Sequence, residues 1–236
     1  MPSDSASPLK VPRTTKSLRE LSLEQMRKAI QQGHFKPGQR LVERSLCEQL
    51  DVSRSVVREV LRHLETEGLV ESIPRQGPVV ATLSAEQAAQ VYEVRASLEG
   101  RAARLCAERA SDAQLARLAG LNDRIQEAFK AGDFQEVVAR TTAFYEALFA
   151  SAGLPMVWDI VRSLNARINR LRLMTISSPG RQQEAADEMG RLIAALQRRD
   201  ALAAQDEAEA HVRRVAQIAR EALAAADAAD AAAKAR

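Results

Sequence analysis

Helix-start signals and helix breakers alternate along almost the whole chain. A Ser or Asp stands three residues before a Glu or Gln at Ser17, Ser84, Ser111 and Asp133, and this spacing lets the two side chains satisfy free backbone N–H groups at a helix start. Gly and Pro, which end helices and form turns, separate the segments that follow. The pattern predicts a mainly α protein with helices at residues 17–32, 43–50, 54–67, 84–109, 111–131, 133–151, 155–177, 181–199 and 201–225.

One short part of the chain has a β pattern instead. Leu69–Ile73 and Val79–Leu83 are rich in β-forming residues, and they flank the five residues from Pro74 to Pro78. The Pro and Gly content of that segment suits a hairpin loop better than a helix. The sequence therefore predicts three helices followed by a small β-hairpin wing.

The charge of the chain is concentrated in its first third. The net charge is +3. Residues 1–83 carry 13 basic and 10 acidic side chains, whereas the remainder carries 21 of each. This asymmetry points to an anionic partner for the first part. A length of 236 residues also allows two domains, since one takes roughly 100 to 200.

Several classes of protein lack support in the sequence. No run approaches the roughly 20 apolar residues that cross a bilayer, and the polar start lacks the apolar core of a signal peptide. We therefore expect a cytoplasmic protein without a membrane partner. Cys47 and Cys106 match no metal-ligand spacing and are expected to be reduced thiols, with no cofactor. No catalytic motif is present, and the three His are far apart in sequence, so we do not expect an enzyme.

The expected helix at 54–67 has an apolar face and a basic face. Its apolar side chains at helical spacing are expected in the core: Val57, Val60, Leu61 and Leu64. Its polar side chains fall on another face, beside the expected N-cap Ser53: Arg54, Ser55, Arg58 and Arg62. Such a helix suits a DNA major groove, where Arg pairs with guanine O6 and N7. The alternative is a solvated charged face, which is what most helical charge clusters are.

A longer stretch resembles the winged-helix signature of the GntR family. The matching residues run from Phe35 to Glu43 and from Val52 to Leu61, and they continue through Leu64 and the segment 67–70. The resemblance covers about residues 17–83. It implies that the chain contacts operator DNA through helix residues, with Ser53 as their N-cap, and through the wing: Arg44, Arg54, Ser55, Arg58, Arg75, Gln76 and Gly77.

Two residues depart from that signature. Val56 stands where many members have Thr or Pro, which affects the expected base preference. Val42 occupies a position often held by a capping Ser or Thr, which weakens one helix cap.

The rest of the chain resembles the FCD effector domain of the FadR subfamily. The resemblance rests on the segment from Tyr92 to Glu99, on Phe144 and on Gly153–Pro155 within an all-helical context. Many FCD domains hold a divalent cation with one Asp and three His. The matching positions here are Thr141, Tyr145, Met189 and His211. Thr and Met are poor ligands for such a cation, so we predict no metal site in the usual place.

A pocket for a small molecule is still expected in this helical part. Asn165, Ile168, Asn169 and Arg172 recur at helical spacing and form a partly polar row. Together with Thr141, Tyr145, Met189 and His211, this row could bind a small anionic effector such as a carboxylate. Alternatively, Asn165 and Arg172 face solvent, Tyr145 and Met189 fill the cavity, and His211 is a core residue. Arg95 and Glu99 are expected to form an ion pair.

These patterns lead to one expected organisation. Residues 1–16 are a disordered tail, 17–83 a winged-helix DNA-binding domain, 84–225 a helical effector and dimerisation domain, and 226–236 an Ala-rich tail that frays. We expect a sequence-specific repressor that binds a pseudo-palindromic operator as a homodimer. The alternatives are a metal-dependent sensor, a ligand-independent repressor with a filled cavity, and a non-specific architectural DNA binder, which a net charge of only +3 disfavours.

Overall fold

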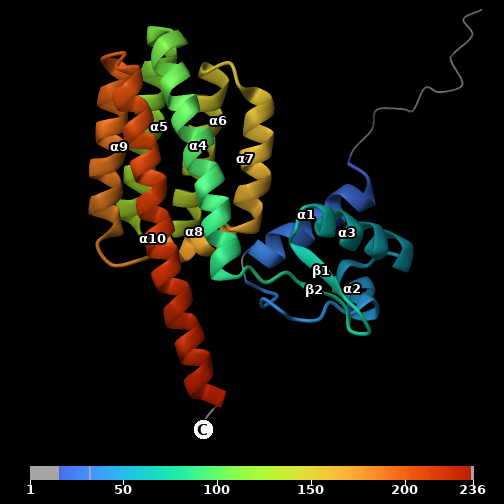
Figure 1. The fold of residues 1–236 in the computed structure, drawn as a ribbon. Coiled ribbons are helices and arrows are strands. Elements are labelled where there is room, and N and C mark those ends of the chain that lie inside the picture. Colours follow the sequence, from blue (N-terminus) through green and yellow to red (C-terminus); the bar gives the residue numbers. More distant parts are fainter. Residues whose placement is uncertain (1–15, 32, 235–236) are drawn as a thin grey trace, which may run out of the picture. The chain divides into compact units, whose positions relative to one another are not determined.

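The chain divides into two compact units between Ala81 and Thr82 (Figure 1). A computed structural model describes residues 16–31 and 33–234. The expected disorder of residues 1–15 and of the last two residues lies outside this part. No helix in the described ranges is long and apolar enough to cross a membrane.

The first unit contains three helices and a two-stranded sheet. Its elements are α1 (Leu18–Gln31), α2 (Glu43–Leu50), α3 (Arg54–Thr66), β1 (Val70–Ile73) and β2 (Gly77–Val80). The strands pair antiparallel, and Ile73 faces Gly77 across the turn. Apolar side chains from all three helices and from both strands form one core. The expected winged helix-turn-helix is therefore present.

The second strand, β2, begins two residues earlier and ends three residues earlier in the chain than the sequence pattern predicts. Arg75 and Gly77 have positive φ angles of 67° and 85°, which close a tight turn after Ile73. Pro78 therefore enters the strand, where its carbonyl accepts a hydrogen bond from the Leu41 N–H at 2.8 Å. The expected strand at 79–83 is wrong in its bounds, since β2 ends at Val80.

The second unit is entirely helical in its described residues. Its core lies between helices that pack against one another, and α10 lies along α4 (Figure 1). The helices are α4 (Ala85–Arg109), α5 (Asp112–Ala131), α6 (Phe134–Ser151), α7 (Pro155–Arg167), α8 (Asn169–Ile176), α9 (Arg181–Gln197) and α10 (Ala201–Lys234).

The helix starts confirm the predicted caps. Ser17, Ser84 and Ser111 each accept a hydrogen bond from the backbone N–H three residues on, and the Glu or Gln at that position bonds back to the serine N–H. Asp133 accepts a hydrogen bond from the Glu136 N–H at 3.0 Å. These local contacts explain why the helix starts could be found in the sequence.

Two expectations for the helical unit are wrong. The single helix expected at 155–177 is broken at Ile168, whose φ and ψ of −101° and 11° are not helical and whose side chain is fully buried. The Ala-rich end, expected to fray from residue 226, remains helical to Lys234. Ala has the highest helix propensity, which favours this extension of α10.

Candidate DNA-reading surface and effector cavity

The start of α3 presents a polar, exposed face. Val57, Val60, Leu61 and Leu64 are buried as predicted, so the opposite face is free. Ser53 caps the helix, and its hydroxyl accepts a hydrogen bond from the Val56 N–H. The side chains on the free face that the sequence predicts for DNA are exposed: Arg54, Ser55, Arg58 and Arg62.

Glu43 lies between two of these arginines, Arg54 and Arg58. No sequence pattern predicted this contact. The Arg58 Nε donates to both carboxylate oxygens of Glu43, at 2.9 and 3.1 Å, and the Arg54 Nε lies 3.7 Å from Oε2. The hydrogen bond that Arg58 donates to Glu43 raises the pKa of Arg58. One carboxylate therefore lies beside both guanidinium groups at the helix start.

The remaining predicted DNA contacts lie on α2 and on the hairpin turn. Arg44 is highly exposed and pairs with Glu48, with 3.2 Å between Nε and Oε1. Arg75 and Gln76 are exposed in the turn, and Gly77 is half-buried. Val42 caps α2 without a side-chain hydrogen bond, as its apolar side chain predicts.

A cavity of about 50 Å³ lies inside the second unit. Six helices line it: α4, α5, α6, α8, α9 and α10. Its wall includes five of the seven residues predicted for the effector: Thr141, Tyr145, Arg172, Met189 and His211. The wall also includes Arg95 and Arg181, which the prediction of the pocket left out.

Asn165 and Asn169 do not line this cavity. The polar row was predicted on one continuous helix, but the break at Ile168 places Asn165 on α7 and Asn169 on α8. Asn165 is buried, and its side-chain oxygen has no hydrogen-bond partner in the described structure. Of the predicted row, only Arg172 contributes to the cavity wall.

Arg172 is a buried cation with weak neutral partners. Its guanidinium donates to the Thr142 hydroxyl at 3.3 Å and to the Val138 carbonyl at 3.4 Å. Burial, together with the positive charge of Arg95, lowers its pKa to about 10. The side chain is therefore protonated at neutral pH. An anion in the cavity would offset the cost of burying this charge.

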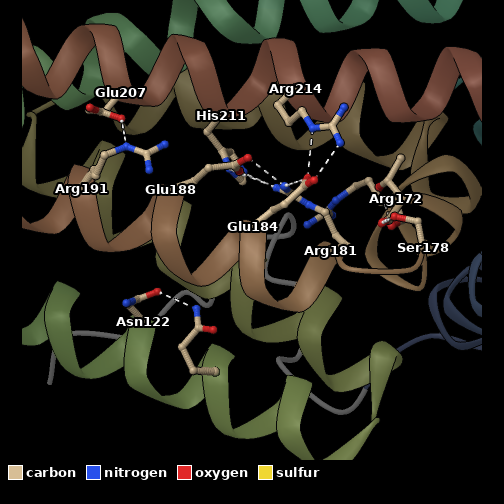
Figure 2. Close-up of polar contacts among 12 residues, drawn as sticks. Asn122, Arg172, Ser178, Arg181, Glu184, Glu188, Arg191, Glu207, His211 and Arg214 are labelled. Carbon is tan, nitrogen blue, oxygen red and sulfur yellow. Dashed lines mark hydrogen bonds and ion pairs between the residues drawn. The ribbon is translucent and has the colours of Figure 1, made fainter.

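Arg181 joins α9 to α10 at another part of the wall. Its Nη1 and Nη2 donate to the two oxygens of Glu188, at 2.9 and 2.7 Å, and Nη2 lies 3.3 Å from the His211 Nδ1. The same Nδ1 lies 2.7 Å from Oε2 of Glu188. Figure 2 shows these three side chains pointing toward one another. Burial alone would raise the pKa of Glu188, but the hydrogen bonds from His211 and Arg181 lower it to about 2.

A second buried pair lies on α4. The Arg95 Nε donates to Glu99 Oε1 at 2.8 Å, which confirms the predicted ion pair. The other carboxylate oxygen of Glu99 and the hydroxyl of Tyr145 have no hydrogen-bond partner within the described ranges. Burial, and then the charge of Glu99, raises the pKa of Tyr145 well above its ordinary value. Tyr145 thus keeps its proton beside the Glu99 carboxylate.

The wall does not fit the divalent cation that many FCD domains hold. The Thr141 hydroxyl donates to the Val137 carbonyl at 2.7 Å, and Met189 is a poor ligand. The His211 Nδ1 faces Glu188 and Arg181. Among the described residues, no three or more His, Cys, Asp or Glu side chains gather as a metal site would require.

Arg181 and Glu188 were missed because their partner is distant in sequence. Arg181, Glu184 and Glu188 are spaced by three and then four residues, which places them on one face of α9. That spacing could have predicted the ion pair between Arg181 and Glu188. Nothing local connects them to His211, which lies 30 residues after Arg181.

Comparison with known proteins identifies both units. Residues 23–80 match the family of bacterial regulatory proteins named gntR, and residues 90–214, more than half of the chain, match the FCD domain. The uncharacterized regulator YdhC of Bacillus subtilis is 27% identical over 79% of this chain and 84% of its own length. The Nta operon transcriptional regulator of Aminobacter aminovorans is 34% identical over 59% of this chain and 66% of its own.

A solved structure shows the same fold. McbR/YncC of E. coli has a TM-score of 0.69 and 24% identity, covering 89% of this chain and 97% of its own. Members of this family bind operator DNA and small-molecule effectors and are not enzymes. The chain belongs to the GntR family of bacterial regulatory proteins, as a transcription regulator that joins a DNA-binding winged helix to an effector-sensing FCD domain.

Proposed function

We propose that the regulator represses transcription by binding a pseudo-palindromic operator as a homodimer in the cytoplasm. One winged helix reads one half-site, so two copies are needed for a two-fold symmetric site. The exposed arginines at the start of α3 support base contacts in the major groove, and the exposed turn at Arg75 and Gln76 supports a wing contact. Arg44 and the capped helix start at Ser53 suit phosphates.

The proposed effector is a small carboxylate that binds in the cavity without a metal. Arg172 carries this proposal, because a protonated guanidinium is buried there and its hydrogen-bond partners among the described residues are all neutral oxygens. A carboxylate would supply charge-assisted hydrogen bonds to it. Binding would favour one of two dimer geometries and so alter the affinity of the paired winged helices for the operator.

DNA binding in the presence of carboxylates tests this function. The full chain is treated with a chelator, and its affinity for an operator selected from random DNA is measured by fluorescence anisotropy with and without small carboxylates. We expect at least one of them to change the affinity of the wild type but not of Arg172→Gln. Arg162→Gln, which removes an exposed arginine of α7, is the control and should respond like the wild type.

A ligand-independent repressor is the second candidate. The observation that favours it is the size of the cavity, about 50 Å³, which is far below the roughly 300 Å³ or more of ordinary ligand pockets. In this case the operator affinity would be unchanged by every carboxylate, with or without added metal. A response that needs added Zn²⁺ or Mn²⁺ would instead show a metal-dependent sensor.

A further inference from the structure

We propose that Arg181, clamped by Glu188 and His211, is a built-in cation that replaces a metal ion and, with Arg172, makes the cavity selective for a compact monocarboxylate. This inference rests on the proposed function, because it specifies how the carboxylate is held and how many charges it carries.

The clamp makes Arg181 a fixed part of the wall. The Arg181 side chain is only 2% exposed, and both of its terminal nitrogens bind Glu188. Such a bidentate pair fixes the position of the guanidinium plane. His211 joins the pair from α10, so the cation connects two helices, as a metal with ligands on both would.

The residues next to this cation explain why a metal is not needed. His211 and Met189 lie at positions where related domains place metal ligands, and both line the same cavity as Arg181. A divalent cation in this cavity would meet an excess of positive charge, because Arg95 and Arg181 are paired with carboxylates and Arg172 is not. The same excess of positive charge attracts an anion directly.

The charges around the cavity set the charge of the ligand. Three guanidinium groups line the wall, and carboxylates are hydrogen-bonded to two of them: Glu99 to Arg95, and Glu188 and Glu184 to Arg181. Glu184 is also paired with Arg214, which does not line the wall. Among these guanidinium and carboxylate groups, one positive charge is left, and it belongs to Arg172. One carboxylate group neutralises the cavity, whereas a dicarboxylate or tricarboxylate would bury unpaired negative charge.

The size of the cavity sets the size of the ligand. About 50 Å³ corresponds to the space of only a few water molecules, at roughly 10 to 15 Å³ each. This suits an acid of two to four carbons.

Calorimetric titration of the chelator-treated full chain tests the inference. The probes are acetate, lactate and pyruvate, each with one carboxylate, and succinate and citrate, with two and three. We expect binding of a monocarboxylate without metal, roughly tenfold or more weaker binding of succinate and citrate, and no gain from added Zn²⁺ or Mn²⁺.

Four variants separate the role of Arg181 from a general structural one. Arg181→Gln should weaken monocarboxylate binding roughly tenfold or more, whereas Arg213→Gln, which removes an exposed arginine of α10 that pairs with Glu209, should leave it unchanged. Glu188→Gln removes one negative charge and should shift the preference toward succinate, a change that loss of structure alone would not produce. If Arg181→Gln fails to fold by circular dichroism, Arg181→Lys keeps the charge and should retain metal-free binding.

The outcomes distinguish this inference from the proposed function. If Arg181→Gln binds a monocarboxylate as tightly as the wild type, if citrate binds at least as tightly, or if binding needs a metal, the inference is wrong. A metal-free carboxylate site at Arg172 survives the first two of these results. If none of the five acids binds with or without metal, the proposal of a carboxylate effector is itself wrong.

Discussion

The two units use the same Arg–Glu pair in opposite settings. In the winged helix, the side chains of Arg58 and Glu43 are 55% and 29% exposed. In the FCD domain, those of Arg181 and Glu188 are 2% and 11% exposed. The distances between the paired atoms are similar, 2.9 and 2.7 Å. Burial rather than geometry therefore separates the two pairs.

This difference decides what each pair can do. An exposed pair is screened by water and salt, so its partners exchange easily, and a DNA phosphate or base can replace Glu43. A buried pair is costly to break because the remaining charge has no water to solvate it. The exposed pair thus suits a surface that must bind and release DNA, and the buried pairs suit a cavity of fixed shape.

The largest effect on stability is expected when a buried ion pair loses its carboxylate. Glu99 is fully buried and Arg95 nearly so, and Glu99→Ala would leave the Arg95 guanidinium buried without its carboxylate. We expect the free energy of unfolding to fall by about 3 to 5 kcal/mol, as for other broken buried pairs. Urea denaturation followed by circular dichroism measures this change.

Glu43→Ala is the matched variant for the exposed pair. It removes the same type of side chain, but its arginine partners remain in water. We expect almost no shift of the urea midpoint. Equal losses of stability in Glu43→Ala and Glu99→Ala would contradict the division between the two units.

Acid should affect the FCD domain through Glu188. The pKa of this carboxyl is lowered from 4.5 to about 2 in the folded chain. A lowered folded pKa contributes stability above the unfolded pKa, and this contribution is lost as the pH falls through the folded value. We therefore expect stability to fall between about pH 4.5 and pH 2. The effect should be smaller than that of Glu99→Ala, because a protonated carboxyl still forms hydrogen bonds.

Thermal melting of the wild type and Glu188→Gln across this pH range checks the expectation. The variant has no carboxyl to titrate at this position, so the difference between the two proteins should shrink toward pH 2. A constant difference from pH 7 to pH 2 would show that Glu188 does not contribute to the acid dependence.

The sequence could predict what depends on neighbouring residues. Ser17, Ser84 and Ser111 bond to backbone groups three residues away, so their helix starts were correct. The two faces of α3 also follow from spacing along one helix. The break at Ile168 has no Gly or Pro to mark it, and its buried side chain packs with residues of α4 and α10. Such a break depends on tertiary packing, which local pattern does not contain.

Prediction of the cavity residues from the sequence meets the same limit. Thr141, Tyr145, Met189 and His211 were placed on one wall by resemblance to the FCD domain, and they do line one cavity. The Arg181 Nη2 lies 3.3 Å from the His211 Nδ1 although the two residues are 30 apart in sequence, and no spacing rule connects them. The polar row through Asn165 and Asn169 relied on an unbroken helix, and it failed at Ile168.

Arg58→Ala should sharply weaken recognition of the operator without unfolding the chain. The side chain is exposed on the polar face of α3, so its loss removes a proposed base contact but little packing. We expect roughly ten- to hundredfold weaker binding to the operator, and binding to unrelated DNA should fall less. Arg191→Ala, which removes an exposed arginine paired with Glu207, is the control. Unchanged protection of the operator in footprinting would defeat the assignment of α3 as the reading helix.

The smallest effect is expected when Arg54 and Arg58 are kept but lose their contact with the Glu43 carboxylate. Glu43→Gln leaves Arg54 and Arg58 in place but takes away the carboxylate that holds both. The freed guanidinium groups can then bind phosphates of any DNA, so affinity for unrelated DNA should rise severalfold, and the slope of log affinity against log salt should steepen by about one.

Glu59→Gln separates this effect from net charge. Glu59 also lies on α3 but pairs with Arg19, so the variant removes one negative charge without freeing the reading arginines. We expect its salt slope to match the wild type. The ratio of the affinity for the operator to the affinity for unrelated DNA should fall in Glu43→Gln but not in Glu59→Gln. The Glu43 carboxylate competes with DNA for the two arginines, and this competition weakens non-specific phosphate contacts more than it weakens base contacts in the operator. Equal responses of the two variants would mean that Glu43 acts only through its charge, and the exposed pair would then have no role in DNA recognition.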